Sequence, residues 1–152
     1  MKKILTIFIV IFSIIILVGC DKEEDDGSKI HLDDKFYGKS EYIKIKADEF
    51  NKLKDNTYIV YTYNSYCSLK VPCETIFKEV MDKYKLTFYS LFSDEAKKTF
   101  VSETVKYAPS IIIIKDKKVV AYLDANSDED LDKYQDSDQF EKWLGEYIYF
   151  EK

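Results

Sequence analysis

Apolar and polar residues along the chain follow two repeats, which predict strands and helices in alternation. Thr57 to Tyr63 (TYIVYTY) is β-branched and aromatic throughout, which indicates a central, buried strand. After residue 139, apolar residues recur at i, i+3, i+4, i+7 and i+8, which predicts a helix with one buried face. The complete set of predicted strands is 42–46, 57–63, 86–92, 109–115 and 119–123, and the predicted helices contain 50–53, 76–84, 95–105 and 140–148.

The order of these elements is β-α-β-α-β-α-β-β-α. The early alternation favours parallel strands joined by helices, whereas the tight turn at 116–118 favours an antiparallel hairpin near the end. The expected fold class is therefore α/β, with a mixed central sheet and helices on both faces.

The first twenty residues have a different pattern. Lys2 and Lys3 precede an apolar run from Ile4 to Val18. As a helix this run would span roughly 22 Å, which is shorter than a bilayer core of about 30 Å and fits the apolar part of a signal peptide. The run ends in Leu-Val-Gly-Cys, which resembles the bacterial lipobox. That resemblance implies cleavage after Gly19 and a lipid on Cys20; the alternative is an uncleaved anchor with an incidental cysteine.

Residues 21–40 are acidic and rich in turn formers, which predicts a solvated tether. His31 lies in this segment and is expected to be a surface residue, because no partners for a metal site are evident around it. We therefore expect a signal peptide at 1–19, a lipidated Cys20 with an acidic tether through residue 40, and one domain at 41–152. This arrangement predicts attachment to the outer face of the cell membrane through the lipid on Cys20.

The overall charge excludes one class of partner. The formal net charge is −5, and it becomes −7 without the first twenty residues, which contain two lysines and no acid. A surface of this sign repels phosphate backbones, so no nucleic acid is expected to bind.

Cys67 and Cys73 form an even pair once Cys20 is assigned to the lipid. Outside the cytoplasm such a pair can persist as a disulfide. Three interpretations remain open: a pair that exchanges electrons, a structural disulfide, and a metal site. Five intervening residues allow an unstrained bridge, which favours a structural role. A helix that begins at Pro72 would place Cys73 in its first turn, where the helix dipole favours the reactive thiolate.

The cysteine segment and a later proline segment resemble the thioredoxin-fold family. Residues 63–67 (YNSYC) are similar to the family's aromatic-x-x-aromatic-Cys, and 71–73 (VPC) to its Gly-Pro-Cys. Residues 108–120 are similar to its cis-proline strand, turn and hairpin. The resemblance covers about 42–148 and implies a thioredoxin-like three-layer sandwich. With its lipobox, the chain is similar to thioredoxin-like lipoproteins of Gram-positive bacteria with a wider cysteine spacing.

The resemblance also implies roles for individual residues. Cys67 and Cys73 would be the catalytic thiols, while Tyr66, Ala108 and Pro109 would bind substrate, with Pro109 in a cis peptide bond. The partners would be extracytoplasmic protein thiols or a membrane redox protein, and neither a cofactor nor a metal is expected.

Three features depart from the family pattern. The cysteine spacing is five residues instead of two, Tyr61 occupies the position of a buried acid, and no histidine lies near the pair. Which cysteine attacks therefore stays open. The alternative to an exchange enzyme is a non-catalytic binding module in which a Cys67–Cys73 disulfide is structural.

Two further patterns have a functional and a structural interpretation. Residues 124–130 resemble the start of a calcium loop, but the glycine and glutamate that such a loop needs are missing, which favours an acidic surface loop. The tyrosines of and next to strand 57–63 (58, 61, 63 and 66) could line a ligand groove, but core packing is the favoured interpretation.

Overall fold

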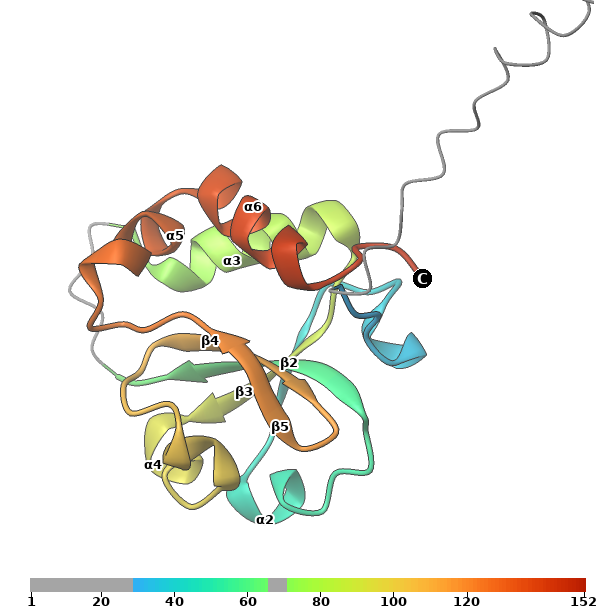
Figure 1. Cartoon of the computed structure of the whole chain (residues 1–152), viewed down its shortest axis with the longest axis vertical. Helices are drawn as coiled ribbons and strands as arrows, with labels where there is room; N and C mark the ends of the chain where they lie inside the picture. Colours follow the sequence, from blue (N-terminus) through green and yellow to red (C-terminus); the bar gives the residue numbers. More distant parts are fainter. Residues whose placement is uncertain (1–28, 66–70) are drawn as a thin grey trace, which may run out of the picture.

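The computed structural model describes residues 29–65 and 71–152, which form a five-stranded mixed sheet (Figure 1). The strand order is β1-β3-β2-β4-β5. The first three of these strands are parallel, whereas β4 is antiparallel to β2 and β5 to β4. The strands are β1 (Tyr42–Lys44), β2 (Thr57–Tyr63), β3 (Phe88–Phe92), β4 (Ser110–Lys115) and β5 (Lys118–Tyr122).

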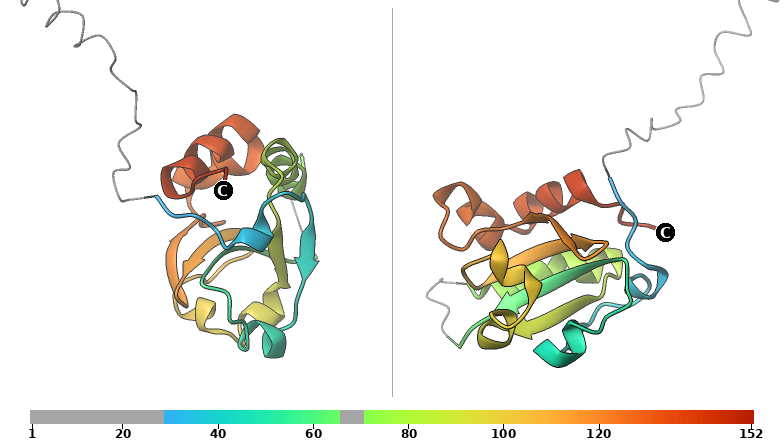
Figure 2. Two further views of the ribbon diagram at one scale, coloured as in Figure 1. Left: turned by 90° about the vertical axis from the view of Figure 1, so that its right-hand side faces the viewer. Right: turned by 60° about the horizontal axis from the view of Figure 1, so that its bottom comes forward.

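Helices cover both faces of this sheet (Figures 1 and 2). One face carries α3 (Cys73–Tyr84), α5 (Leu131–Gln135) and α6 (Ser137–Tyr147). The other carries α2 (Ala47–Phe50), α4 (Ser93–Ala96) and the 3-10 helix η3 (Phe100–Glu103). Two further 3-10 turns are η2 (Asp34–Phe36) and η4 (Asp128–Asp130). The predicted α/β three-layer sandwich with a mixed sheet is confirmed.

The central strand and the two long helices form as the apolar pattern predicts. β2 lies in the middle of the sheet, and six of its seven residues are buried. In α3 the buried residues after Cys73 are Ile76, Phe77, Val80 and Met81, which is one stripe of a helix. Tyr58 and Tyr61 are 1% and 5% exposed, so the expectation that these strand tyrosines belong to the core is confirmed.

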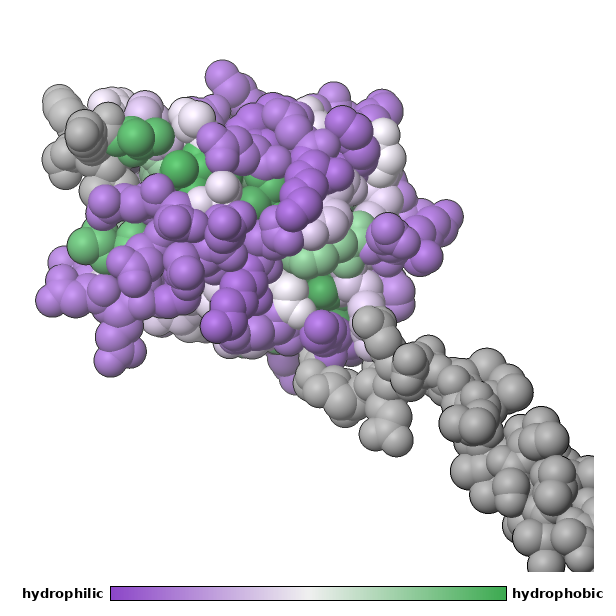
Figure 3. All heavy atoms as spheres, turned by 90° about the horizontal axis from the view of Figure 1, so that it is seen from above, coloured by the Kyte–Doolittle hydropathy of each residue, from purple (hydrophilic) through white to green (hydrophobic). Residues whose placement is uncertain are grey.

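The outer side of the helical layer is mostly hydrophilic, with small apolar patches between charged side chains (Figure 3). No helix within 29–65 and 71–152 is long and apolar enough to cross a membrane. The apolar run at 4–18 and Cys20 lie outside the described residues, so the signal peptide and the lipid remain predictions.

The predicted tether was wrong for residues 29–40, which pack against the domain. Leu32 and Phe36 are 3% and 0% exposed. The Asp33 carboxylate accepts the backbone N–H groups of Asn56 and Thr57, at 2.8 and 3.1 Å. Ile30 pairs with Ile148 as a short β-bridge. The acidic composition masked a few well-spaced apolar residues, each of which has a place in the core.

The predicted helix at 95–105 was also wrong in its continuity. It is divided into α4 and η3 around Thr99. The Thr99 hydroxyl donates to the Ala96 carbonyl at 2.8 Å, and the Ser102 hydroxyl donates to the Lys97 carbonyl at 3.2 Å. Hydroxyl side chains compete in this way with the helical backbone bonds, so the segment forms two short turns.

The acidic loop at 124–130 uses its carboxylates within the loop. Asp130 accepts the backbone N–H of Asp124 at 2.8 Å, and Asp124 accepts that of Asn126 at 2.9 Å. Lys133 also donates to Asp130, at 3.0 Å. Among the described residues, no three His, Cys, Asp or Glu side chains are grouped so that they could hold a metal ion.

Candidate functional site

Cys73 is the first residue of α3, and Pro72 is the N-cap of that helix. Proline suits this position because its fixed φ and missing N–H cost nothing at a helix start. The expectation that Cys73 lies in the first helical turn is therefore confirmed. Its side chain is only 2% exposed. Tyr66 and Cys67 lie outside the described residues, so the pairing of Cys67 with Cys73 remains a prediction.

The hydroxyl of Tyr61 lies 3.8 Å from the Cys73 sulfur, within the range of a sulfur hydrogen bond. Tyr61 belongs to β2 and points toward α3. Tyr61 occupies the position of the buried acid in the family that the sequence resembles, so that acid is missing here. The structure shows that the same position supplies a hydroxyl to the thiol. The signal in the sequence was the position of Tyr61, two residues before Tyr63.

Burial keeps the phenols around Cys73 neutral. The pKa of Tyr61 is raised well above its usual range, first by burial and then by the nearby Cys73. The pKa of Tyr42 is raised by burial, with Glu74 and Cys73 adding to the effect. Burial also raises the pKa of Tyr134. A phenol of ordinary pKa is already protonated at neutral pH, and burial extends the range in which these three groups remain O–H donors to higher pH.

Phe77 connects the two sides of this site. It lies one helical turn after Cys73, and its ring makes edge contacts with Tyr61 and with Tyr134, at centroid distances of 5.6 and 5.7 Å. Cys73 and Phe77 thus share the face of α3 that points at the sheet. The thiol is positioned by aromatic packing between β2, α3 and α5.

The Ala108–Pro109 segment precedes β4, and its peptide bond is cis, as the resemblance implies. The Asn64 amide donates to the Ala108 carbonyl at 2.8 Å, which fixes the segment to the end of β2. The Tyr134 hydroxyl donates to the Pro109 carbonyl at 2.8 Å and lies 3.0 Å from the Leu123 carbonyl. Tyr134 is therefore common to the surroundings of Cys73 and of Pro109.

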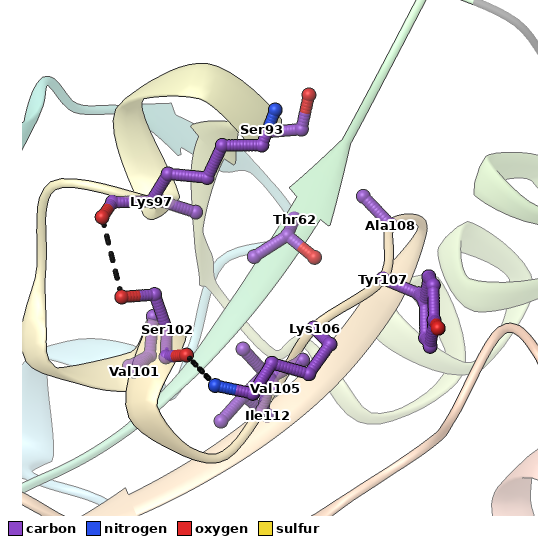
Figure 4. A pocket seen from close by; sticks show the side chains of 11 residues that line it. Thr62, Ser93, Lys97, Val101, Ser102, Val105, Lys106, Tyr107, Ala108 and Ile112 are labelled. Atoms are coloured by element: carbon purple, nitrogen blue, oxygen red, sulfur yellow. Dashed lines mark hydrogen bonds between the residues drawn. The ribbon is translucent and has the colours of Figure 1, made fainter.

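A narrow pocket beside Ala108 lies on the other face of the sheet (Figure 4). Thr62, which lines it, points away from α3 because neighbouring residues of a strand face opposite sides. The Lys106 amine donates to the Ser102 carbonyl at 2.7 Å, and Ser102 in turn bonds to Lys97. Because it lies on the opposite face of the sheet, this pocket is separate from the thiol site.

Comparisons with known proteins give matches among solved structures alone: no protein-family model and no curated protein matches the chain. Reduced Schistosoma mansoni thioredoxin pre-protein is 23% identical with a TM-score of 0.48, over 72% of this chain and 100% of that one. Thioredoxin f2 of Chlamydomonas reinhardtii is 19% identical with a TM-score of 0.42, over 59% of this chain and 89% of that one. An Entamoeba histolytica thioredoxin mutant is 15% identical with a TM-score of 0.45, over 62% and 96% of the two chains.

The strand order and the helix layers carry the fold assignment by themselves. The described residues form a thioredoxin-like α/β sandwich with a cysteine at the first turn of its central helix.

Proposed function

We propose that the protein exchanges thiols and disulfides through Cys67 and Cys73. The observation that carries this proposal is the position of Cys73, at the N-terminus of a twelve-residue helix and within 3.8 Å of a neutral phenol. Burial disfavours a thiolate there, whereas the helix dipole and the Tyr61 O–H favour it. Two of these three effects therefore favour the reactive thiolate at Cys73.

In the proposed reaction one thiolate attacks a disulfide of the partner and forms a mixed disulfide, releasing one partner thiolate. The second thiol of the pair, once deprotonated, attacks the mixed disulfide and releases the other partner sulfur. The Cys67–Cys73 pair is oxidised by two electrons and the partner disulfide is reduced to two thiols. Because Cys73 is buried, we assign the attack to Cys67 and the resolving step to Cys73.

We also propose where this reaction takes place. The lipobox-like end of the apolar run supports a lipid on Cys20, and with it attachment to the outer face of the cell membrane. The partners would then be extracytoplasmic protein thiols or a membrane redox protein. Tyr66, Ala108 and Pro109 would contact the substrate next to the cysteine pair.

The burial of Cys73 favours a second candidate function. Buried cysteines are often inert, and a thiol that is 2% exposed can serve as one half of a structural bridge. In that case the domain would be a binding module, and the Cys67–Cys73 disulfide would stabilise it without exchanging electrons.

Disulfide reduction by the full chain separates the two functions. The chain carries Cys20→Ser, so that the two remaining cysteines act alone, and insulin reduction by dithiothreitol is followed in detergent micelles. An exchange protein should accelerate this reaction, and Cys73→Ser should abolish the acceleration and trap a mixed disulfide on Cys67.

The melting temperature of the same variants provides the control. No acceleration by the parent protein would contradict the exchange function. If Cys73→Ser also lost about 2–5 kcal/mol of stability, the structural bridge would be the better description.

A further inference from the structure

A small cavity of about 120 Å³ lies beside Tyr61, between three strands and the start of α3. Its lining side chains are Tyr42, Lys44, Tyr61, Tyr63, Glu74 and Ser90. Tyr61 and Lys44 are both register partners of Ser90, on the strands to either side of β3. The three side chains therefore project from the same face of the sheet, which is the face toward Cys73.

Ser90 is the residue of the cavity lining whose hydrogen bonding is incomplete. It is 4% exposed, and among the described residues its hydroxyl is the one buried side-chain group without a hydrogen-bond partner. Buried polar groups nearly always have partners, because leaving one unpaired costs about 1–3 kcal/mol. The cavity next to this hydroxyl has polar groups in its lining and is large enough to admit water, which would supply the missing partner.

We propose that the hydroxyls of Tyr61 and Ser90, bridged by water in this cavity, form a hydrogen-bond chain that stabilises the Cys73 thiolate in the core. The proposal rests on the exchange function only for its biological use, because the hydrogen-bond chain is a property of the buried thiol. It assigns Tyr61 and Ser90 as positioning residues, which act through hydrogen bonds on a thiol that solvent does not reach directly.

The proton balance of thiolate formation is simple. The Cys73 S–H gives its proton to the Tyr61 oxygen while the Tyr61 O–H gives its own proton to the bridging water, which passes one on to solvent. The products are a Cys73 thiolate and a proton in solution, and no electrons move. Tyr61 is neutral before and after, which agrees with the burial that disfavours its phenolate.

The surrounding charges act on the same equilibrium and define the controls. Lys44 on β1 favours a thiolate, and Glu74 on α3 opposes it. Tyr42 on β1, Tyr63 on β2 and Tyr134 on α5 are the other titratable groups of the cavity and of the thiol's surroundings. The Tyr61 hydroxyl lies 3.8 Å from the Cys73 sulfur, and substitution of Tyr61 or Ser90 leaves the charges of Lys44 and Glu74 unchanged.

The test is a pH titration of Cys73 followed by NMR of its ¹³Cβ atom, which reports the thiol and does not require it to be accessible. The full chain carries Cys20→Ser and Cys67→Ser, so that the signal comes from one residue. Tyr61→Phe removes the hydroxyl and keeps the ring, and we expect the midpoint to rise by about one pH unit, a roughly tenfold loss of thiolate below both midpoints. Tyr58→Phe is the matched control: it removes a buried hydroxyl from the opposite face of β2 and should leave the midpoint unchanged.

Ser90 has its own pair of variants. Ser90→Thr keeps a hydroxyl and Ser90→Val replaces it with a methyl group of nearly the same shape, so the two differ in hydrogen bonding and hardly in volume. We expect Ser90→Val to reduce the thiolate fraction about twofold, because the chain of hydrogen bonds is interrupted one step further from sulfur. Ser90→Thr should titrate like the parent.

Equal midpoints for parent and Tyr61→Phe would overturn the proposal, as would equal effects of Thr and Val at position 90. These results are separate from the exchange function, which is tested by insulin reduction. A protein with the expected midpoints and no exchange activity would keep the hydrogen-bond chain and lose the proposed function. An active exchange protein with unchanged midpoints would support the proposed function and contradict the hydrogen-bond chain.

Discussion

Strand β2 has two buried tyrosines that face opposite sides of the sheet, and their surroundings differ. Tyr58 faces α2, where its ring lies 6.2, 6.1 and 5.6 Å from those of Phe36, Phe50 and Tyr89. Tyr61 faces α3, where its hydroxyl contacts the Cys73 sulfur. Two tyrosines three positions apart thus have different roles: Tyr58 belongs to a packed aromatic core, and Tyr61 belongs to the thiol site.

Charges reinforce this difference. On the Tyr58 side, Lys35 pairs with Asp55 at 2.7 Å, and the Tyr89 hydroxyl donates to the same carboxylate at 2.8 Å. The polar groups of that network bond to one another at the edge of the core. On the Tyr61 side the neutral hydroxyls are directed at a sulfur and at backbone carbonyls. The comparison teaches that the role of a strand tyrosine depends on which helix covers it.

The largest effect should come from removing a large ring from the aromatic core around Tyr58. Phe36→Ala removes a fully buried ring and should lower the free energy of unfolding by about 3–5 kcal/mol, which urea denaturation would measure. Thiol exchange by the folded fraction should be unchanged, because Phe36 lies on the side away from Cys73. A loss of exchange as large as that in Cys73→Ser, in protein that is still folded, would contradict the separation of the two sides. Phe150→Ala, which removes a half-buried ring at the C-terminus, is the matched control and should cost less.

A smaller effect is expected from a hydroxyl on the site side. Tyr134→Phe leaves the ring in place and removes the donor to the Pro109 and Leu123 carbonyls. Leaving these carbonyls short of a partner should cost about 1–3 kcal/mol. Thermal unfolding of the two proteins at one pH would show the loss. Identical melting temperatures would mean that Tyr134 does not hold the Pro109 segment.

The smallest effect should depend on pH. Lys83 and Tyr84 donate hydrogen bonds to Glu141, which lowers the pKa of that carboxyl. A carboxyl with a lowered folded-state pKa stabilises the fold above its unfolded value, near 4.3, and loses this contribution as the pH falls through the folded value. Glu141→Gln should therefore be less stable than the parent at pH 7, and the difference should disappear in the acid range.

The control for that prediction is Glu146→Gln, which removes the same charge from an exposed position of α6. Urea denaturation at several pH values would compare the three proteins. A stability difference between parent and Glu141→Gln that stayed constant down to pH 3 would contradict an ionic role for Glu141.

Much of the fold could be predicted because its signals are long and periodic. β2 and α6 have uninterrupted patterns, and the structure places both as expected. The segment at 29–40 could not be predicted, since its buried residues are few and stand among acids. The break in the helix at 95–105 depends on hydroxyl side chains that accept and donate locally, which a search for apolar periodicity does not weigh.

The site was predictable in part. The order Pro72-Cys73 at a strand-to-helix junction predicted a thiol in the first turn of a helix, and this is confirmed. The contact between Tyr61 and Cys73 could not be predicted, because it joins residues twelve positions apart through the packing of β2 against α3. Ser90 gave no signal, because a serine within an apolar strand indicates nothing until its neighbours across the sheet are known.

The reduction potential of the Cys67/Cys73 pair tests the proposed exchange most directly. The full chain with Cys20→Ser would be equilibrated in detergent across glutathione and dithiothreitol buffers, and its thiols trapped and counted. An exchange protein should have a value between about −120 and −270 mV. A value below about −300 mV would identify a structural disulfide and contradict the proposal.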